Sequence, residues 1–572
     1  MAESENYSPE ELNYAVLEVG GWEYLIPSLR DQKVLCIDSA GLVASLVARQ
    51  CGQVVVLADD RCVESVGLVM KALGNQNVTI VPQSHWLRDS GGRLRGFDGM
   101  ICHYLAAGAA IGGDLNRLDG ILASARRALR SGGFIYIGIR NAYSIRRILR
   151  RTDTGNARPV SVRRVAAKLD RAGFTECHRH PFLIADHRLL EVLGKNGYES
   201  TKNPGKFVER IKGVLFGPLG SRFFAPAYGV VAHSGSARES LLVKVMGLLQ
   251  EKYFPSHQGR GALVAKQYLV LNGGKVILKL GFADSHDDDF VAVLVRDHQA
   301  LARREREAEM LDLLSRSNSR YASLFPRTIG RIDVDGVHCF VLTGLPGATI
   351  DQDVSELDEV TNKAFEFLLS FHQETRRAVR IDSAVFDGLF AALFAAARER
   401  NACQSRELVL IEGMIRQRAI GMTLPTVWMH GDFKVENVMY DPRTLALSGV
   451  IDWELSQSPG LPLLDLKYLN YYGRIIQGTP WLDAFREVCL LERRGSPEER
   501  RCRQYADALQ LGADWIPILN VMFLIHHFGC RFKTSPSDHQ MQEQVTMLMR
   551  ECIRMLEATA SRVVESSSND RN

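Results

Sequence analysis

The sequence lacks several features that would place it in a specialised class of protein. Its 11 cysteines are scattered from Cys36 to Cys552 with no Cys-x-x-Cys pair, which indicates reduced thiols and not a disulfide framework. The stretch that follows Met1 is acidic and polar, without the basic and apolar regions of a signal peptide. The apolar run at residues 515–525 is too short to span a bilayer. These absences lead us to expect a cytoplasmic protein with no membrane span.

An excess of charge of one sign is also lacking. Lys and Arg number 70 against 66 Asp and Glu, and the net charge of +4 is ordinary for 572 residues, so we expect no nucleic-acid partner. Charged residues at 24% and hydrophobic residues at 46% are typical of a globular protein. A chain of this length exceeds what one core supports, and roughly two to four domains are expected. The sequence does not indicate an oligomeric state.

The most informative stretch contains three polar side chains in a telling order. Asp432 and Asn437 are five residues apart, and Asp452 follows the apolar pair Val450-Ile451. In phosphoryl transfer, one such aspartate accepts the proton of the attacking hydroxyl, while an amide oxygen and a second carboxylate coordinate Mg²⁺. Hard oxygen ligands suit Mg²⁺, which keeps waters and substrate phosphates as its other ligands. The stretch therefore predicts a site for metal-assisted phosphoryl transfer.

A hairpin is expected to return Asp452 to this loop. Residues 438–440 predict one short strand, residues 441–444 a turn and residues 447–451 the antiparallel partner. The alternative is a chance match, in which residues 451–453 are only a buried strand with a capping acid. The order and the intervening hairpin favour the catalytic interpretation.

Residues 430–437 and 451–454 together resemble the signature of the aminoglycoside phosphotransferase and choline kinase group, relatives of protein kinases that phosphorylate small-molecule hydroxyls. The resemblance implies that Asp432 is the catalytic base and that Asn437 and Asp452 bind Mg²⁺. It implies that His430 fixes the loop and that Lys434 contacts the γ-phosphate of ATP. A solvated loop lysine is the alternative for Lys434.

The same resemblance covers the segments around the loop. Residues 461–466 match a family segment whose acid, here Asp465, braces the catalytic loop. Residues 338–347 resemble the strand and hinge that meet the adenine, so backbone groups at Leu342 and Thr343 are expected to bind the base. Helical periodicity over residues 480–560 predicts a helical lower lobe, and the Ser-rich, charged residues 563–572 predict a disordered tail.

One expected cation is out of place. Kinases of this kind carry a lysine on the third strand and pair it with a helix glutamate, for which Glu307 stands in the expected position. On the strand at residues 290–296, Val293 occupies the lysine's place. The nearest substitutes are Arg296 at the strand end and Lys279 on the adjacent strand, where Lys279 could reach the phosphates or point to solvent.

The first half of the chain alternates strands and helices. Residues 34–38, 53–58, 97–102 and 134–139 predict strands, and residues 118–129 predict a helix, which indicates a doubly wound α/β domain with a parallel sheet. Residues 129–134, 170–174 and 224–232 resemble a turn, a helix-to-strand junction and the closing strand of class I S-adenosylmethionine-dependent methyltransferases. The resemblance implies a cofactor loop after the first strand.

That loop departs from the family. Asp38 fits its acidic start, but Leu42 stands where a glycine would let the backbone approach the cofactor, and Gly41 is out of phase. Asp59 would bind the ribose hydroxyls of S-adenosylmethionine or cap the following helix. Two interpretations stay open: a reshaped cofactor pocket, or a structural domain that has lost its cofactor.

We therefore expect a multi-domain chain that joins a Rossmann-like α/β domain to a two-lobed, protein-kinase-like fold. The expected parts are a methyltransferase-like domain (1–235), a kinase-like N-lobe (236–345), a helical C-lobe (346–562) and a tail (563–572). The expected function is ATP- and Mg²⁺-dependent phosphorylation of a hydroxyl on a small-molecule acceptor such as a sugar, amino sugar or glycan intermediate. The alternatives are a non-catalytic nucleotide-binding scaffold, or an active methyltransferase with an accessory kinase-like domain. Binding of S-adenosylmethionine by residues 1–235 would favour the last, and retained methyl transfer would make the chain bifunctional.

Overall fold

The structure is a computed structural model that describes residues 9–88, 94–103, 115–140, 161–185, 188–192, 227–255, 261–271, 275–283, 290–317, 319–350, 356–400, 405–490, 495–530 and 539–569. The chain divides into two compact units. Unit 1 comprises residues 1–301 and 329–344, and unit 2 comprises residues 302–328 and 345–572. Each unit is described by itself.

Parallel strands begin unit 1, as the alternation of strands and helices predicts. Strands β1, β2, β3, β4 and β5 pair in parallel in the order β3-β2-β1-β4-β5, and β8 closes this part antiparallel to β5. The strands are β1 Lys33–Ile37, β2 Gln53–Ala58, β3 Val78–Pro82, β4 Phe97–Cys102, β5 Leu129–Arg140, β6 Thr175–Ala185, β7 Arg188–Val192 and β8 Ala227–His233.

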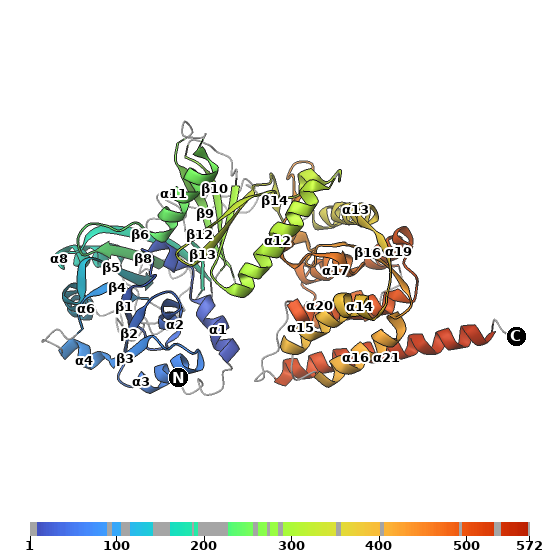
Figure 1. Cartoon of the computed structure of the whole chain (residues 1–572), viewed down its shortest axis with the longest axis horizontal. Helices are drawn as coiled ribbons and strands as arrows, with labels where there is room; N and C mark the ends of the chain where they lie inside the picture. Colours follow the sequence, from blue (N-terminus) through green and yellow to red (C-terminus); the bar gives the residue numbers. More distant parts are fainter. Residues whose placement is uncertain are drawn as a thin grey trace. The chain divides into compact units, whose positions relative to one another are not determined.

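Helices cover both faces of this sheet because successive strand residues point to opposite sides. Val34 and Cys36 pack in one apolar cluster with α2 and α3, while Leu35 and Ile37 pack in a second cluster with α6 and α8. Figure 1 shows the helices around these strands in blue to cyan. The helices of unit 1 are α1 Pro9–Glu18, η2 Trp22–Leu25, α2 Leu42–Ala48, α3 Val63–Ala72, α4 Gln83–Arg88, α6 Leu115–Ala128, α8 Val162–Arg171 and α11 Leu241–Tyr253.

The antiparallel strands that follow continue the same sheet. Strand β7 pairs with β9, so the sheet runs β12-β13-β11-β10-β9-β7-β6-β8-β5-β4-β1-β2-β3. The first apolar cluster extends along it to Leu278, Ala292 and Val341. This shared core explains why the strands group with the first half of the chain. They are β9 Leu263–Val270, β10 Val276–Phe282, β11 Phe290–Val295, β12 Thr328–Val334 and β13 Val337–Thr343.

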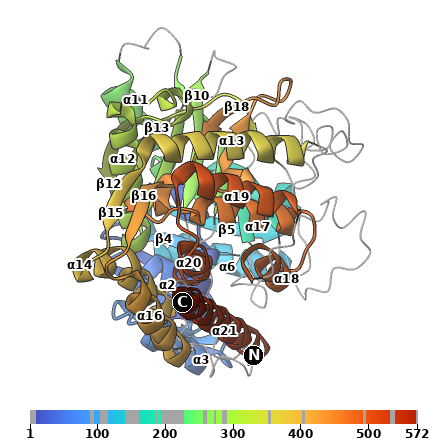
Figure 2. The ribbon, with the colours of Figure 1, turned by 90° about the vertical axis from the view of Figure 1, so that its right-hand side faces the viewer.

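Unit 2 is mainly helical, as the periodicity of residues 480–560 predicts. The apolar helix α20 is buried along most of its length and packs against α15, α17 and α21 (Figure 2). The helices are α12 His298–Arg316, whose first turn belongs to unit 1, η5 Ala322–Leu324, α13 Leu357–Thr375, α14 Ser383–Phe386, η6 Asp387–Ala391, α15 Ala392–Arg400, α16 Ser405–Ala419, η8 Val435–Asn437, η9 Trp453–Leu455, α17 Leu464–Ile476, α18 Trp481–Phe485, η10 Arg486–Leu490, α19 Pro497–Leu509, α20 Trp515–Cys530 and α21 His539–Asn569.

Short strands in unit 2 frame the predicted loop. They are β14 Ala348–Thr349, β15 Arg377–Arg380, β16 Thr423–Met429, β17 Val438–Tyr440, β18 Leu447–Val450 and β19 Gln457–Gly460. The expected hairpin is confirmed, because β17 and β18 pair antiparallel with Val438 opposite Val450.

The disordered tail expected at residues 563–572 stays a prediction, and the structure describes α21 from His539 to Asn569. Among the helices described, none combines the length and the apolar character needed to cross a bilayer.

Candidate active site

The loop after β16 is held by a buried carboxylate. The backbone N–H groups of His430 and Gly431 donate to Asp465 at 2.7 and 2.8 Å, and His372 Nε2 lies 3.4 Å from the same carboxylate. Asp465 is fully buried. Burial acts to raise its pKa, but the hydrogen bond and charge of His372, with His430, outweigh it and hold the pKa below its usual value. The position of Asp465 therefore suits the predicted role of holding the loop through its backbone.

His430 joins this loop to the hairpin. Its Nε2 lies 2.9 Å from the carbonyl oxygen of Ile451, and the backbone N–H of Asp432 donates to its Nδ1 at 3.2 Å. An acceptor at one nitrogen and a donor at the other select the neutral tautomer with the proton on Nε2. Gly431 has φ of 81°, and a Cβ there would collide with the carbonyl of Leu455. Only glycine therefore allows the bend at this point.

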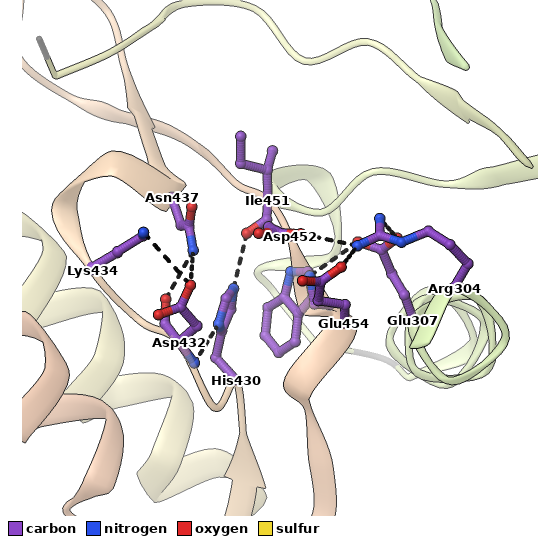
Figure 3. A network of polar contacts seen from close by, with 10 residues as sticks. Arg304, Glu307, His430, Asp432, Lys434, Asn437, Ile451, Asp452 and Glu454 are labelled. Atoms are coloured by element: carbon purple, nitrogen blue, oxygen red, sulfur yellow. Dashed lines mark hydrogen bonds and ion pairs between the residues drawn. The ribbon is translucent and has the colours of Figure 1, made fainter. Parts of the chain in front are cut away.

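Asp432 and Asn437 are in direct contact, as their spacing predicts. The Asn437 amide donates to the Asp432 carboxylate and to its carbonyl oxygen, both at 2.9 Å. Asp432 is buried, and Lys434 Nζ lies 3.9 Å from its carboxylate. With both donors engaged, the amide oxygen of Asn437 points away from Asp432 (Figure 3).

The hairpin presents Asp452 at its end. The Ile451 N–H donates to the Asn437 carbonyl at 3.0 Å, which ties the two predicted metal ligands through one residue. Asp452 has φ 68° and ψ 55°, a left-handed conformation that is uncommon for residues other than glycine. Such backbone is kept where the surroundings determine it, as at functional sites.

Helix α12 supplies a cation to this carboxylate. Arg304 Nη2 lies 3.1 Å from Asp452 Oδ1, and the same guanidinium contacts Glu307 and Glu454 (Figure 3). Glu307 Oε1 in turn accepts from the Trp453 N–H at 3.0 Å. The helix glutamate that the resemblance pairs with a strand lysine is thus paired with Arg304.

Arg304 is only 3% exposed in its side chain. Burial acts to lower its pKa, but Glu307, Glu454 and Asp452 outweigh it and raise the pKa above the usual value. Sequence reasoning missed Arg304 and Glu454. The one local signal was the spacing of Arg304 and Glu307, three residues apart on a helix.

The oxygen donors of this site fit Mg²⁺. Asn437 offers an amide oxygen and Asp452 a carboxylate that is 29% exposed. Among the residues described, no group of three or more His, Cys, Asp and Glu side chains is arranged to hold a metal ion. A metal would therefore complete its coordination with waters and substrate phosphates, which is how Mg²⁺ is commonly bound.

Lys279, one of the two substitutes considered for the missing strand lysine, lies in unit 1. Val293 is buried on β11, and Lys279 on β10 lies opposite Val291, which lies opposite Leu342 on β13. Directly paired residues share a sheet face, so Lys279 and Leu342 share a face, to which Val293 also belongs. The apolar core covers the other face, through Leu278 and its neighbours. Lys279 therefore lies on the same face of the sheet as Val293, the position where the lysine was expected.

The two residues expected at the adenine hinge, Leu342 and Thr343, end β13. Leu342 is buried and lies opposite Val291, while Thr343 lies opposite Phe290. Strand β11 ends at Val295, so Arg296, the other substitute considered for the lysine, follows the strand. Its guanidinium lies 5.2 Å from the centre of the Tyr24 ring.

The first loop of unit 1 is organised by Asp38. Its buried carboxylate accepts from the backbone N–H groups of Ala40 at 2.8 Å and Ala44 at 2.9 Å. Burial raises its pKa, although backbone donors, Ala44 first, act to lower it. Gly41 has φ of 83° and precedes α2. Asp38 therefore shapes the loop, because its carboxylate is hydrogen-bonded to backbone N–H groups of the chain itself.

Asp59 lies at the carboxyl end of β2. Its Oδ1 accepts from the Arg61 N–H at 3.1 Å and pairs with the Arg61 side chain at 3.3 Å. Helix α3 begins at Val63, and its N-cap residue, Cys62, makes no side-chain capping bond. The alternative role for Asp59 as the cap of this helix is therefore wrong.

Comparison with known sequences finds one family match, in the second half. Residues 267–505 match the sequence model of the phosphotransferase enzyme family. The matched region contains Lys279, Glu307, the loop of residues 430–437 and the hairpin that carries Asp452. No curated protein sequence matches the chain at a significant level.

Solved structures resemble each half. An aminoglycoside phosphotransferase from Streptomyces rimosus is 16% identical, covers 53% of this chain and 98% of its own length, and has a TM-score of 0.33. A SAM-dependent methyltransferase from Archaeoglobus fulgidus is 16% identical and covers 40% of this chain and 94% of its own, with a TM-score of 0.28. Scores this low carry no argument about function.

The hydrogen bonds that Asp465 accepts from His430 and Gly431 give a prediction for stability. We expect Asp465→Asn to lower the free energy of unfolding by about 3 kcal/mol at neutral pH, because two backbone donors lose a charged acceptor. Since the folded pKa of Asp465 is lowered, its stabilisation is present above the unfolded pKa of about 4 and is lost as pH falls through the folded value. Urea unfolding followed by tryptophan fluorescence should show the difference from wild type shrinking below about pH 4. A difference that is constant with pH would contradict this role.

Proposed function

We propose that the chain transfers the γ-phosphoryl group of ATP to a hydroxyl of a small molecule such as a sugar, amino sugar or glycan intermediate. The observation that carries the proposal is the contact of Asp432 with Asn437 at 2.9 Å. The Ile451 N–H donates to the Asn437 carbonyl oxygen, and Asp452 is the next residue of the chain. The match of residues 267–505 to a phosphotransferase family supports it independently.

Each side chain has a distinct task in this reaction. Asp432 accepts the proton of the acceptor hydroxyl, and the Asn437 amide holds it in place by donating to its carboxylate and to its backbone carbonyl oxygen. Lys434, with Nζ 3.9 Å from Asp432, supplies positive charge where the γ-phosphate would receive the hydroxyl. His430 and Asp465 keep the loop in shape and do not contact the reacting atoms.

Asn437 and Asp452 would hold Mg²⁺. When bound, the ion would neutralise negative charge on the β- and γ-phosphates. Arg304 orients Asp452 through one carboxylate oxygen and carries one positive charge among three carboxylates, so the cluster remains negative and favours a divalent cation.

Lys279 is the proposed phosphate contact from unit 1, with Leu342 and Thr343 as backbone contacts to adenine. Replacement by methionine keeps the length of the side chain and removes its charge. We expect Lys279→Met to weaken ATP binding about tenfold, because one charged contact to phosphate is lost. Lys71→Met, an exposed lysine on α3 of the same unit, is the control and should bind ATP as wild type does. Unchanged affinity of Lys279→Met would remove Lys279 from the site.

For the first half, we propose a degenerate methyltransferase-like domain that holds or positions the same metabolite. The buried bonds of Asp38 and the presence of Leu42 support lost or reshaped cofactor binding. If S-adenosylmethionine binds, Gly41 would allow its approach and Asp59, whose side chain is 30% exposed, would meet its ribose. Dialysis of the full chain against labelled S-adenosylmethionine separates the two cases.

A non-catalytic, nucleotide-binding regulator is the second candidate. The observation that favours it is the ion pair of Arg304 with Asp452, which places a cation on a predicted metal ligand. The intact pair of Asp432 and Asn437 favours catalysis, since a scaffold does not require a positioned base.

The deciding experiment measures transfer itself. The full chain is incubated with Mg²⁺ and ATP labelled in the γ-phosphate, over panels of sugars, amino sugars and aminoglycosides, and phosphorylated product is measured. Transfer to at least one acceptor, lost in Asp432→Asn, is the expected result. ATP binding with no transfer to any acceptor class would favour the regulator.

A further inference from the structure

A cavity of about 620 Å³ lies in unit 1, and its lining includes none of the residues predicted for the two sites. Its walls come from the segment between α1 and β1, the end of α2, the junction of β11 with α12 and the turn between β12 and β13. Arg49 and Gln50 follow α2, so they lie at the end of the parallel strands opposite to the loop of Asp38 and Asp59. A volume of this order suits a small molecule.

The walls carry charges of both signs, with cations in excess. Four cationic side chains line the cavity, namely Arg30, Arg49, Lys275 and Arg296. Three acids also line it, but Asp335 is already paired with Lys244 at 2.8 Å, and Asp297 accepts from the Ala300 N–H at 2.9 Å. The third, Glu23, is only 4% exposed. Cations therefore outnumber acids on the lining, and Glu23 and Asp297 lie within electrostatic reach of Arg296 and Arg49.

Two wall residues have polar atoms that lack hydrogen-bond partners. Arg296 Nε and Gln50 Oε1 are both buried without a partner, although the Arg296 Nη1 lies 3.5 Å from the Asp335 carbonyl. Buried polar atoms in proteins are nearly always hydrogen-bonded, and an exception calls for an explanation such as a bound partner. Arg296 Nε is a cationic donor and Gln50 Oε1 is an acceptor, so a ligand that bonded to both atoms would accept at one end and donate at the other.

We propose that this cavity binds a small molecule that carries a phosphate or carboxylate group together with an amino or hydroxyl group. The anionic oxygens accept from Arg296 Nε, in a lining with four cationic side chains. The amino or hydroxyl group donates to Gln50 Oε1. The site is independent of the proposed phosphoryl transfer, because its lining residues exclude the whole catalytic loop.

Three matched probes test the proposal on the full chain. Phosphoethanolamine and β-alanine carry the same aminoethyl group with a phosphate or a carboxylate, and ethanolamine lacks the anion. Saturation-transfer NMR at constant ionic strength should show saturable binding of phosphoethanolamine or β-alanine, and no saturable binding of ethanolamine. Which of the two binds more tightly identifies the anionic group.

Variants assign the binding to this cavity. Arg296→Gln should weaken it about tenfold or more, since a charged hydrogen bond is lost. Gln50→Met, which keeps the approximate size of the side chain and removes the acceptor oxygen, should weaken it while Arg296 is intact, so a folding defect in one variant does not decide the outcome. Lys71→Gln removes a positive charge elsewhere in unit 1 and should bind as wild type does. Absence of saturable binding, or equal binding by both cavity variants and wild type, would overturn the proposal.

Discussion

The Asp432→Asn variant is expected to transfer phosphate about 10²–10⁴-fold more slowly than wild type, with the affinity for ATP unchanged. Asparagine has the shape of aspartate and can still accept the bond from Asn437, so the loop should keep its geometry. It cannot take up the proton of the acceptor hydroxyl. The loss should therefore appear in kcat and not in the binding of ATP.

The matched control is Asp441→Asn in the turn of the hairpin. The Asp441 carboxylate accepts from the Arg443 and Thr444 N–H groups, and an asparagine oxygen can do the same. This variant should transfer phosphate at the wild-type rate. A rate for Asp432→Asn within about threefold of wild type would contradict the role of Asp432 as general base.

The second large effect concerns stability. Arg304→Met should lower the free energy of unfolding of unit 2 by about 3–5 kcal/mol, because Glu307, Asp452 and Glu454 lose their shared cation in a largely buried place. Methionine fills similar volume, so the loss is one of charge and hydrogen bonds more than of packing. Urea unfolding monitored by Trp453, next to the cluster, should report it.

Two further variants test whether the loss of stability comes from the contacts of Arg304. Arg306→Met, an exposed position on the same helix, should leave the free energy of unfolding within about 0.5 kcal/mol of wild type. Arg304→Lys keeps the charge but lacks the planar fork that contacts several carboxylates, so an intermediate loss is expected. A loss below about 1 kcal/mol for Arg304→Met would contradict the view that this arginine orders the site.

Local sequence was enough to predict the catalytic loop and its hairpin. Asp432 and Asn437 are five residues apart, and the pairing of Val438 with Val450 spans a short turn, so backbone geometry alone brings these groups together. The alternation of strands and helices in the first half likewise predicted the parallel sheet, because three of its four parallel pairs join consecutive strands and the fourth joins β1 to β4.

Contacts between distant residues could not be predicted in this way. Arg304 and Asp452 are 148 positions apart, and no local pattern indicates that they meet. The pairing of β7 with β9, which joins the antiparallel strands to the first sheet, depends on tertiary packing in the same way. Charged residues on a helix usually face solvent, so the burial of Arg304 was the least predictable feature of the site.

The most direct test of the central claim is calorimetric titration of the full chain with ATP, with and without Mg²⁺, beside Asp452→Asn. The asparagine keeps an oxygen for Arg304 and removes the charge that would hold the metal. We predict binding that depends on Mg²⁺ in the wild type and loses that dependence in the variant. Absence of ATP binding by the wild type, or Mg²⁺-dependent binding of equal strength in the variant, would contradict the assignment of this site to Mg²⁺-dependent phosphoryl transfer.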